Sequence, residues 1–165
     1  MSVEFHAENE QVLLDALTAS GLRYTTRRGV IVVGSGEISI NLASGKATVQ
    51  EGWQAQLNSI KQAYSLQAVK AAASRTGWRL VAGKTPNTGQ IMRYGAKSTM
   101  TYEVLEDGKI SVKTGDMGGA NHLSADEFMK SLEKVMGGPT TVRPNHDGKQ
   151  RISHLHSHGG IKHSH

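Results

Sequence analysis

The sequence predicts an α+β fold in which a mostly antiparallel sheet of hairpins packs against three or four helices, followed by a basic, histidine-rich tail. Three observations support this prediction. Apolar residues recur at helical spacing in several regions, they alternate in the short segments between these regions, and glycine or proline separates the segments. We expect one α+β domain over residues 1–138, with 1–95 and 99–138 as possible sub-units, and a tail over residues 139–165.

The first fifty residues predict a helix and three short strands. Residues 8–20 place an apolar stripe on one helical face, and Gly21 suits the position just after the helix end. The stripe consists of Val12, Leu13, Ala16 and Leu17. The strands, separated by tight glycine turns, are predicted at 29–33, 37–43 and 46–51. The alternation of Ile38, Ile40 and Leu42 indicates a half-buried sheet.

Residues 53–77 predict either one broken helix or two consecutive helices. Trp53, Leu57 and Ile60 begin an apolar stripe, and Ser65 is a residue type that favours the N-cap of a second helix. Gly77 is expected to end the helical region in the left-handed conformation.

Two hairpins and a last helix complete the predicted domain. Strands at 78–83 and 90–95 form the first hairpin, and the second spans 99–115 with a type I′ turn at Asp107-Gly108. The last helix is predicted over 123–137, with Ser124 and Glu127 as a capping box. Its buried stripe is Phe128, Leu132 and Val135, and Gly137 and Pro139 end it.

The composition limits the chemistry of the chain. There is no cysteine, which excludes disulfides, a thiolate nucleophile and cysteine-type zinc sites. No run of 18 apolar residues predicts a membrane span, and the N-terminus does not resemble a signal peptide, so we expect a cytoplasmic protein without membrane contact. No nucleotide-binding or hydrolase motif occurs in a suitable context, so we expect neither a cofactor nor a catalytic residue.

A net charge of +5 and a pI near 9.6 favour an anionic partner, although solubilising charges would give the same balance. Basic and aromatic side chains that could share a sheet and helix face are candidates for anion binding. They are Arg27, Arg28, Lys70, Arg75, Arg79, Arg93 and Tyr94. In particular, pairing of the 78–83 and 90–95 strands could bring Arg79 and Arg93 onto one exposed face.

The tail carries six of the eight histidines and four Lys or Arg against one Asp. Low hydrophobicity predicts disorder unless a partner orders this segment. His154, His156 and His158 alternate, so an extended chain would place three imidazoles on one side, where they could bind a metal ion.

The segment 62–94 resembles a family of uncharacterised open reading frames from cyanobacteria, algal plastids and phages. The resemblance covers roughly residues 1–95 and lies in the order of the elements more than in single letters. The matching residues are Gln62, Tyr64, Val69, Lys70, Ala73, Gly77, Trp78, Arg93 and Tyr94.

Residues 99–138 are similar to a second small family of unknown function, with its strand, Asp-Gly, strand and helix. The chain has Ser-Ala-Asp-Glu-Phe at residues 124–128, where a cysteine is expected in that family, so a thiol-dependent role is in doubt. In bacteria, genes of these two families look like neighbours and often lie near a gene for an AAA+ ATPase. The double resemblance implies an accessory role and carries over no catalytic residue.

These observations lead to two functional hypotheses. The first is a non-enzymatic binding, adaptor or structural protein that acts within a larger assembly through a protein partner or self-association, in the cytoplasm or in a virion if the source is a phage. The alternative is a binder of nucleic acid or of a nucleotide signal through a basic sheet or helix face.

Overall fold

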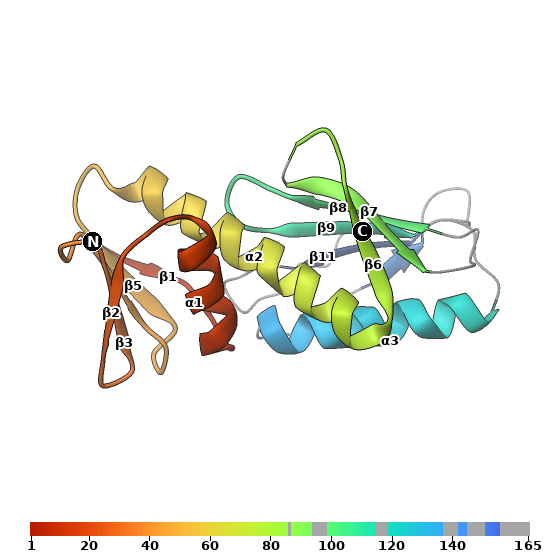
Figure 1. Cartoon of the computed structure of the whole chain (residues 1–165), viewed down its shortest axis with the longest axis horizontal. Coiled ribbons are helices and arrows are strands. Elements are labelled where there is room, and N and C mark those ends of the chain that lie inside the picture. The colour runs from red at the N-terminus through yellow and green to blue at the C-terminus, as the bar shows by residue number, and fades with distance from the viewer. Residues whose placement is uncertain (86, 94–98, 115–118, 137–141, 145–150, 156–165) are drawn as a thin grey trace.

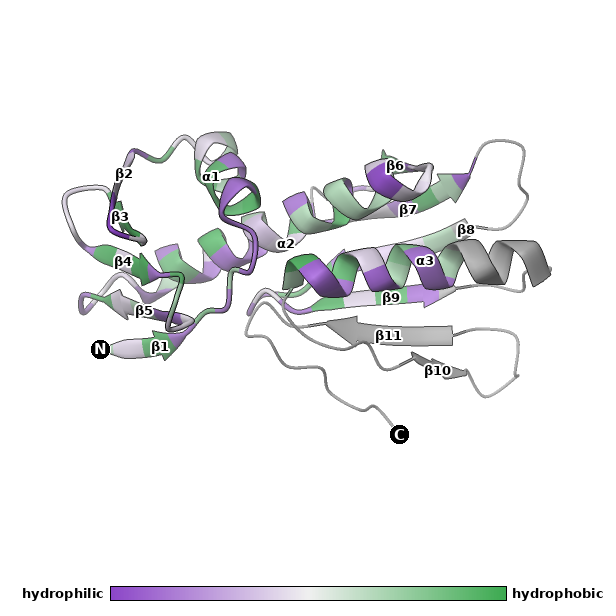
Figure 2. Cartoon of the chain, turned by 90° about the horizontal axis from the view of Figure 1, so that it is seen from below, coloured by the Kyte–Doolittle hydropathy of each residue, from purple (hydrophilic) through white to green (hydrophobic). Residues whose placement is uncertain are grey.

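The computed structural model of the chain describes residues 1–85, 87–93, 99–114, 119–136, 142–144 and 151–155. The described residues form two antiparallel sheets and three helices, which confirms the predicted α+β class. One sheet lies at each end of the long helix α2, which spans Gln54–Thr76 (Figures 1 and 2). We call the region before α2 the first half and the region after it the second half.

The first half combines helix α1, Glu10–Ala19, with a sheet in the order β1-β5-β4-β3-β2. Its strands are β1 (Ser2–Glu4), β2 (Tyr24–Arg27), β3 (Val30–Val33), β4 (Ile38–Asn41) and β5 (Lys46–Val49). The predicted stripe of α1 is buried, and Asn9 caps the helix by accepting a hydrogen bond from the Val12 N–H. Gly21 follows the helix end at φ +70°, as predicted, and the Leu22 N–H donates to the Leu17 carbonyl in a Schellman motif.

The second half combines helix α3, Gly119–Met136, with a sheet in the order β10-β11-β9-β8-β7-β6. The strands are β6 (Trp78–Ala82), β7 (Thr88–Arg93), β8 (Thr99–Val104), β9 (Ile110–Thr114), β10 (Val142–Pro144) and β11 (Arg151–Leu155). Since β7 pairs with β8, this sheet runs across the point at residues 95–99 where the two possible sub-units were divided. Since β11 pairs with β9, part of the predicted tail belongs to the sheet.

Helix α2 packs against elements of both halves. Its buried side chains include Leu57, Ile60, Val69 and Ala73, and it packs against α1, α3 and the second sheet. The helix is continuous, so the prediction that Ser65 caps a second helix is wrong. The Ser65 side chain is buried, and its hydroxyl donates a hydrogen bond to the Gly108 carbonyl at 2.6 Å, in the β8–β9 turn. Ser65 therefore makes a tertiary contact instead of capping a helix. Gly77 ends α2 in the left-handed conformation at φ +78°, as predicted.

Polar contacts at the middle of α2 join the two halves. The Tyr64 hydroxyl accepts a hydrogen bond from the Asn9 N–H at 3.2 Å and donates to the Val135 carbonyl at 2.5 Å, so it links α1 to α3. The Tyr64 ring meets the Phe5 ring edge to face, with centroids 5.9 Å apart. Gln62 donates to the Glu106 carbonyl and accepts from the Asn87 side chain. We call these contacts the α2 joint.

One turn prediction and one cap prediction need correction. The β8–β9 hairpin exists, but Gly108 adopts positive φ while Asp107 does not, so the turn is a type I turn followed by a left-handed glycine. The type I′ turn instead joins β2 to β3 at Arg28-Gly29, where φ is +49° and +79°. Helix α3 begins at Gly119, so Ser124 lies inside the helix and is not its N-cap. Gly137 and Pro139 lie outside the described residues.

Candidate functional site

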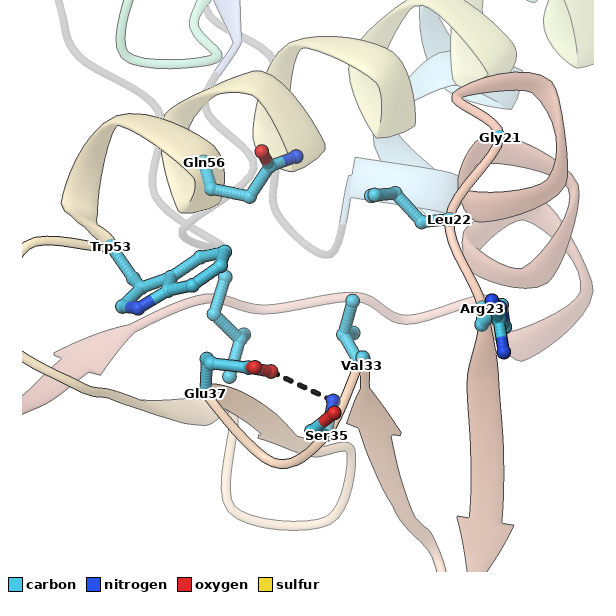
Figure 3. Close-up of a pocket in the computed structure, with 10 residues that line it drawn as sticks. Gly21, Leu22, Arg23, Val33, Ser35, Glu37, Trp53 and Gln56 are labelled. Atoms are coloured by element: carbon cyan, nitrogen blue, oxygen red, sulfur yellow. Dashed lines mark hydrogen bonds between the residues drawn. The ribbon is translucent and has the colours of Figure 1, made fainter.

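The first half contains a pocket of about 410 Å³. It lies between the α1–β2 connection, the β3–β4 turn and the first turn of α2 (Figure 3). Ten residues line it: Gly21, Leu22, Arg23, Val33, Gly34, Ser35, Glu37, Ile38, Trp53 and Gln56. Its volume lies within the range of small-molecule sites in proteins, about 300–1,000 Å³.

The backbone around the pocket is held by turn chemistry. The Gly34 N–H donates to the Arg23 carbonyl at 2.8 Å, which fixes the α1–β2 connection against the β3–β4 turn. Within that turn the Glu37 carboxylate accepts a hydrogen bond from the Ser35 N–H at 2.8 Å. Gly34 is at φ +65°, and a Cβ there would lie 2.7 Å from the Glu37 carboxylate, so glycine permits this closure.

Two large side chains face each other across the pocket. The Trp53 indole comes from the residue before α2, and Leu22 comes from the α1–β2 connection on the opposite side (Figure 3). Trp53 is 40% exposed, and it is one of three large hydrophobic residues that are exposed in the described part of the chain. The exposed indole therefore offers a flat apolar surface toward the pocket.

Three polar side chains add to the lining. The Gln56 amide points into the space between Trp53 and Leu22, and Arg23 lies beside Leu22 at the rim (Figure 3). Neither Gln56 nor Arg23 has a hydrogen bond or ion pair from its side chain to another described residue. Glu37 bonds to Ser35 through one carboxylate oxygen, which leaves its second oxygen able to accept a hydrogen bond.

The predicted basic face is divided in the structure. Arg27 ends β2 and Arg28 lies in the β2–β3 turn, both exposed in the first half. The other described members of the set lie in α2 or the second sheet and are also exposed: Lys70, Arg75, Arg79 and Arg93. Tyr94 lies outside the described residues.

The expectation that Arg79 and Arg93 share a sheet face is wrong. The β6–β7 register pairs Trp78 with Arg93 and Arg79 with Met92. Since directly paired residues point to the same side and neighbours along a strand alternate, Arg79 and Arg93 lie on opposite faces. Trp78 is buried, so Arg93 is on the helix-facing side, at the strand end.

Most of the histidines predicted to bind a metal ion lie outside the described residues. His154 lies in β11, where the register pairs it with Ser111 of β9. His156 and His158 lie outside the described residues. Within the described residues, no group of three or more His, Asp or Glu side chains is arranged to hold a metal ion.

The largest shift in titration is at Tyr64, in the α2 joint rather than in the pocket. Burial raises the pKa of Tyr64 to about 12. Burial also lowers the pKa of Lys61, with Asp107 and Glu4 partly opposing the effect, and the Lys61 ammonium lies 6.0 Å from the centre of the Phe5 ring. Tyr64 is part of the α2 joint and Lys61 is buried beside Phe5, so these shifts report packing.

The stretch that resembles the first family is mainly structural. Gln62 and Tyr64 form the joint, Val69 and Ala73 are buried, and Gly77 ends the helix. Comparison of the chain with models of known protein families, with curated proteins and with solved structures finds no match. No helix within the described residues is both long and apolar enough to span a membrane.

Sequence reasoning missed Arg23, Trp53 and Gln56 as a group. Trp53 was assigned to the apolar stripe of α2, whereas the structure places it before the helix and partly exposed. The signal available in the sequence was Gly52, which precedes the tryptophan and adopts φ +88°. A glycine at this position favours a turn before α2, which marks Trp53 as the residue before the helix rather than part of its stripe.

Proposed function

We propose that the protein is a non-enzymatic binding or adaptor protein that acts within a larger assembly. The observation that supports this proposal is an open face on each sheet. In the first sheet and in strands β6 to β9 of the second, one face is buried against helices, while the residues that alternate with the buried ones are exposed or half-exposed. A sheet face without a covering layer is a surface that a partner can use.

The open faces carry mostly polar and charged side chains. In the first sheet the exposed residues of this face are Ser2, Glu4, Thr25, Arg27, Asn41, Lys46 and Thr48. In the second sheet they are Arg79, Val81, Gln90, Thr101, Glu103 and Lys113. Because the α2 joint links the two halves, the two surfaces are held on one scaffold, which suits a protein that bridges partners.

The resemblance to two families supports the same role. It favours an accessory protein working beside an AAA+ ATPase, or a phage protein, through a protein partner or self-association. Such a protein would act in the cytoplasm or in a virion.

Light scattering after size exclusion tests this proposal on the full chain in low and high salt. We expect an oligomer, or co-purification with a partner, that persists in high salt. Thr48→Arg and Thr101→Arg each place a bulky cation on one open face, so the variant that disrupts the complex identifies the sheet in use. A monomer without a partner at all salt concentrations would contradict the proposal.

A second candidate function is the binding of an anionic ligand, either nucleic acid or a nucleotide. The Arg23 side chain at the rim of a pocket walled by Trp53 favours it. Binding to a polyanion should weaken steeply as salt increases, whereas a protein contact through faces that mix neutral polar side chains with charges of both signs should weaken much less. The same size-exclusion runs, followed by ultraviolet absorbance for co-purifying nucleic acid, separate the two candidates.

A further inference from the structure

The pocket of the first half offers three kinds of contact to one ligand. Trp53 and Leu22 form facing apolar walls, Gln56 and Glu37 supply hydrogen-bonding groups, and Arg23 supplies a positive charge (Figure 3). A ligand that satisfies all three must contain a flat ring, polar groups on the ring edge and an anionic group.

The walls favour an aromatic ring. An indole face stacks on planar rings, and such stacking is tolerant of the identity of the ring. Trp53 keeps 40% of its surface exposed, so a ring placed between it and Leu22 would bury surface that the fold leaves open.

The polar groups favour a heteroaromatic ring with an amino group. The Gln56 amide can both donate and accept hydrogen bonds, as can the edge of a nucleobase. The Glu37 carboxylate accepts only, and one of its oxygens is taken by Ser35. A ring amino group would donate to the remaining oxygen, whereas a ring carbonyl in its place would repel it.

The charge of Arg23 favours a phosphate. A guanidinium presents several donors in a planar fork that matches phosphate oxygens, and Arg23 has no ion pair with another described residue. We propose that this pocket binds an amino-substituted nucleotide, with its base between Trp53 and Leu22, its amino edge at Gln56 and Glu37, and its phosphate at Arg23. This inference rests on the second candidate function and assigns it a site and a ligand class.

The same chemistry could come from a free mononucleotide or from one nucleotide of a single strand. Isothermal titration calorimetry of the full chain tests both, with adenosine monophosphate and with a hexamer of deoxyadenylate. Purine riboside monophosphate lacks the amino group and adds no other donor, and adenosine lacks the phosphate. We expect adenosine monophosphate to bind at least about tenfold more tightly than either. Tighter binding of the hexamer per nucleotide would identify a single strand as the source.

Variants locate the binding site. Arg23→Gln should weaken adenosine monophosphate binding by about 10- to 100-fold, and Trp53→Ala should weaken it comparably. Lys130→Gln removes an exposed cation of α3, far from the lining of the pocket, and should leave the affinity unchanged. Far-ultraviolet circular dichroism checks that each variant is folded.

The possible outcomes distinguish a wrong pocket assignment from a wrong second candidate function. Unchanged affinity in both Arg23→Gln and Trp53→Ala, with binding that is lost in Arg79→Gln, would overturn the pocket assignment and leave anion binding intact. Purine riboside monophosphate binding as tightly as adenosine monophosphate would overturn the assigned role of Glu37, and adenosine binding as tightly would overturn that of Arg23. No heat change with either nucleotide probe would overturn both the pocket assignment and the second candidate function.

Discussion

Both halves of the molecule pack a sheet against helices, but they differ in strand length and in the side chains of their cores. Strands of the first half have three or four residues, and its core is mainly aliphatic: Ile31, Ile38, Ile40, Ala47 and Val49. Strands β6 to β9 of the second half have five or six residues, and its core contains large aromatic and sulfur-containing side chains: Trp78, Met100, Tyr102, Phe128 and Met129.

The turns differ in the same way. Most glycines with positive φ lie in the first half or directly before α2: Gly21, Gly29, Gly34, Gly36, Gly45 and Gly52. Short strands and left-handed turns determine the chain path there, and the pocket lies where two of these turns meet the start of α2. In the second half, large side chains fill the space between sheet and helices. The candidate site therefore lies in the half whose chain path is determined by glycine turns.

The first prediction tests whether the α2 joint couples the two halves. Leu13 of α1 and Leu132 of α3 are both fully buried, so Leu13→Ala and Leu132→Ala should each lower the free energy of unfolding by about 2–5 kcal/mol. Urea unfolding is followed by the fluorescence of Trp53 alone, in a Trp78→Phe background, and of Trp78 alone, in a Trp53→Phe background.

Each leucine variant should move both fluorescence transitions together, because α2 contributes to both cores. If Leu13→Ala moved the Trp53 transition and left the Trp78 transition in place, the halves would unfold independently, and the comparison would be between two separate folding units.

The second prediction concerns the packed turns of the first half. Gly45 and Gly77 both have left-handed backbones, at φ +67° and +78°. A Cβ on Gly45 would lie 2.4 Å from Nδ1 of His6, whereas a Cβ on Gly77 would meet open space. Gly77→Ala should therefore cost about 1–2 kcal/mol from backbone strain alone, and Gly45→Ala more than that, at least about 2 kcal/mol.

Thermal unfolding of the two glycine variants in the same buffer measures this difference. Equal losses would show that His6 moves aside freely and that the first-half turn is not constrained by packing.

The third prediction concerns the hydroxyl at the α2 joint. Tyr64→Phe leaves the Asn9 N–H and the Val135 carbonyl without their partner and should cost about 1–2 kcal/mol. Tyr24→Phe is the matched control, because the half-buried Tyr24 side chain makes no hydrogen bond to another described residue. That variant should change stability by less than about 0.5 kcal/mol. The urea unfolding midpoints of the two variants measure this difference in stability. Similar midpoints would argue against a stabilising role for the Tyr64 hydroxyl.

Much of the fold could be predicted from local patterns. The apolar stripes of α1 and α3, the helix stop at Gly77 and the β6–β7 and β8–β9 hairpins follow from spacing and turn residues. Strands β1 and β2 were not predicted, because Ser-Val-Glu and Tyr-Thr-Thr-Arg are short and mostly exposed and so lack clear alternation.

Long-range contacts account for two further errors. Ser65 has the chemistry of an N-cap, but its hydroxyl bonds to Gly108, 43 residues away, which no local pattern indicates. The pairing of β11 with β9 likewise depends on contacts between distant segments. For the candidate site, Arg23 and Trp53 are 30 positions apart, and only the fold brings them to one pocket.

The last prediction uses pH to measure how strongly the joint is buried. Burial raises the pKa of Tyr64 to about 12 from an ordinary value of 10.0. Between pH 10 and pH 12 the folded state therefore keeps a proton that the unfolded state releases, so stability falls as pH rises through this window. The contribution amounts to about 1.4 kcal/mol at pH 11.

Comparison with Tyr64→Phe isolates this effect, because the other titrating groups are present in both proteins. Burial raises the pKa of Tyr102 and so acts in the same direction, whereas the lowered pKa of Lys61 makes stability rise as pH approaches 10.5. Both contributions cancel in the difference between the two proteins. The stability advantage of the wild type over Tyr64→Phe should shrink by about 1.4 kcal/mol between pH 9 and pH 11. An advantage that stays constant would mean that water reaches the Tyr64 hydroxyl, and that the joint between the halves is looser than the buried cores on either side of it.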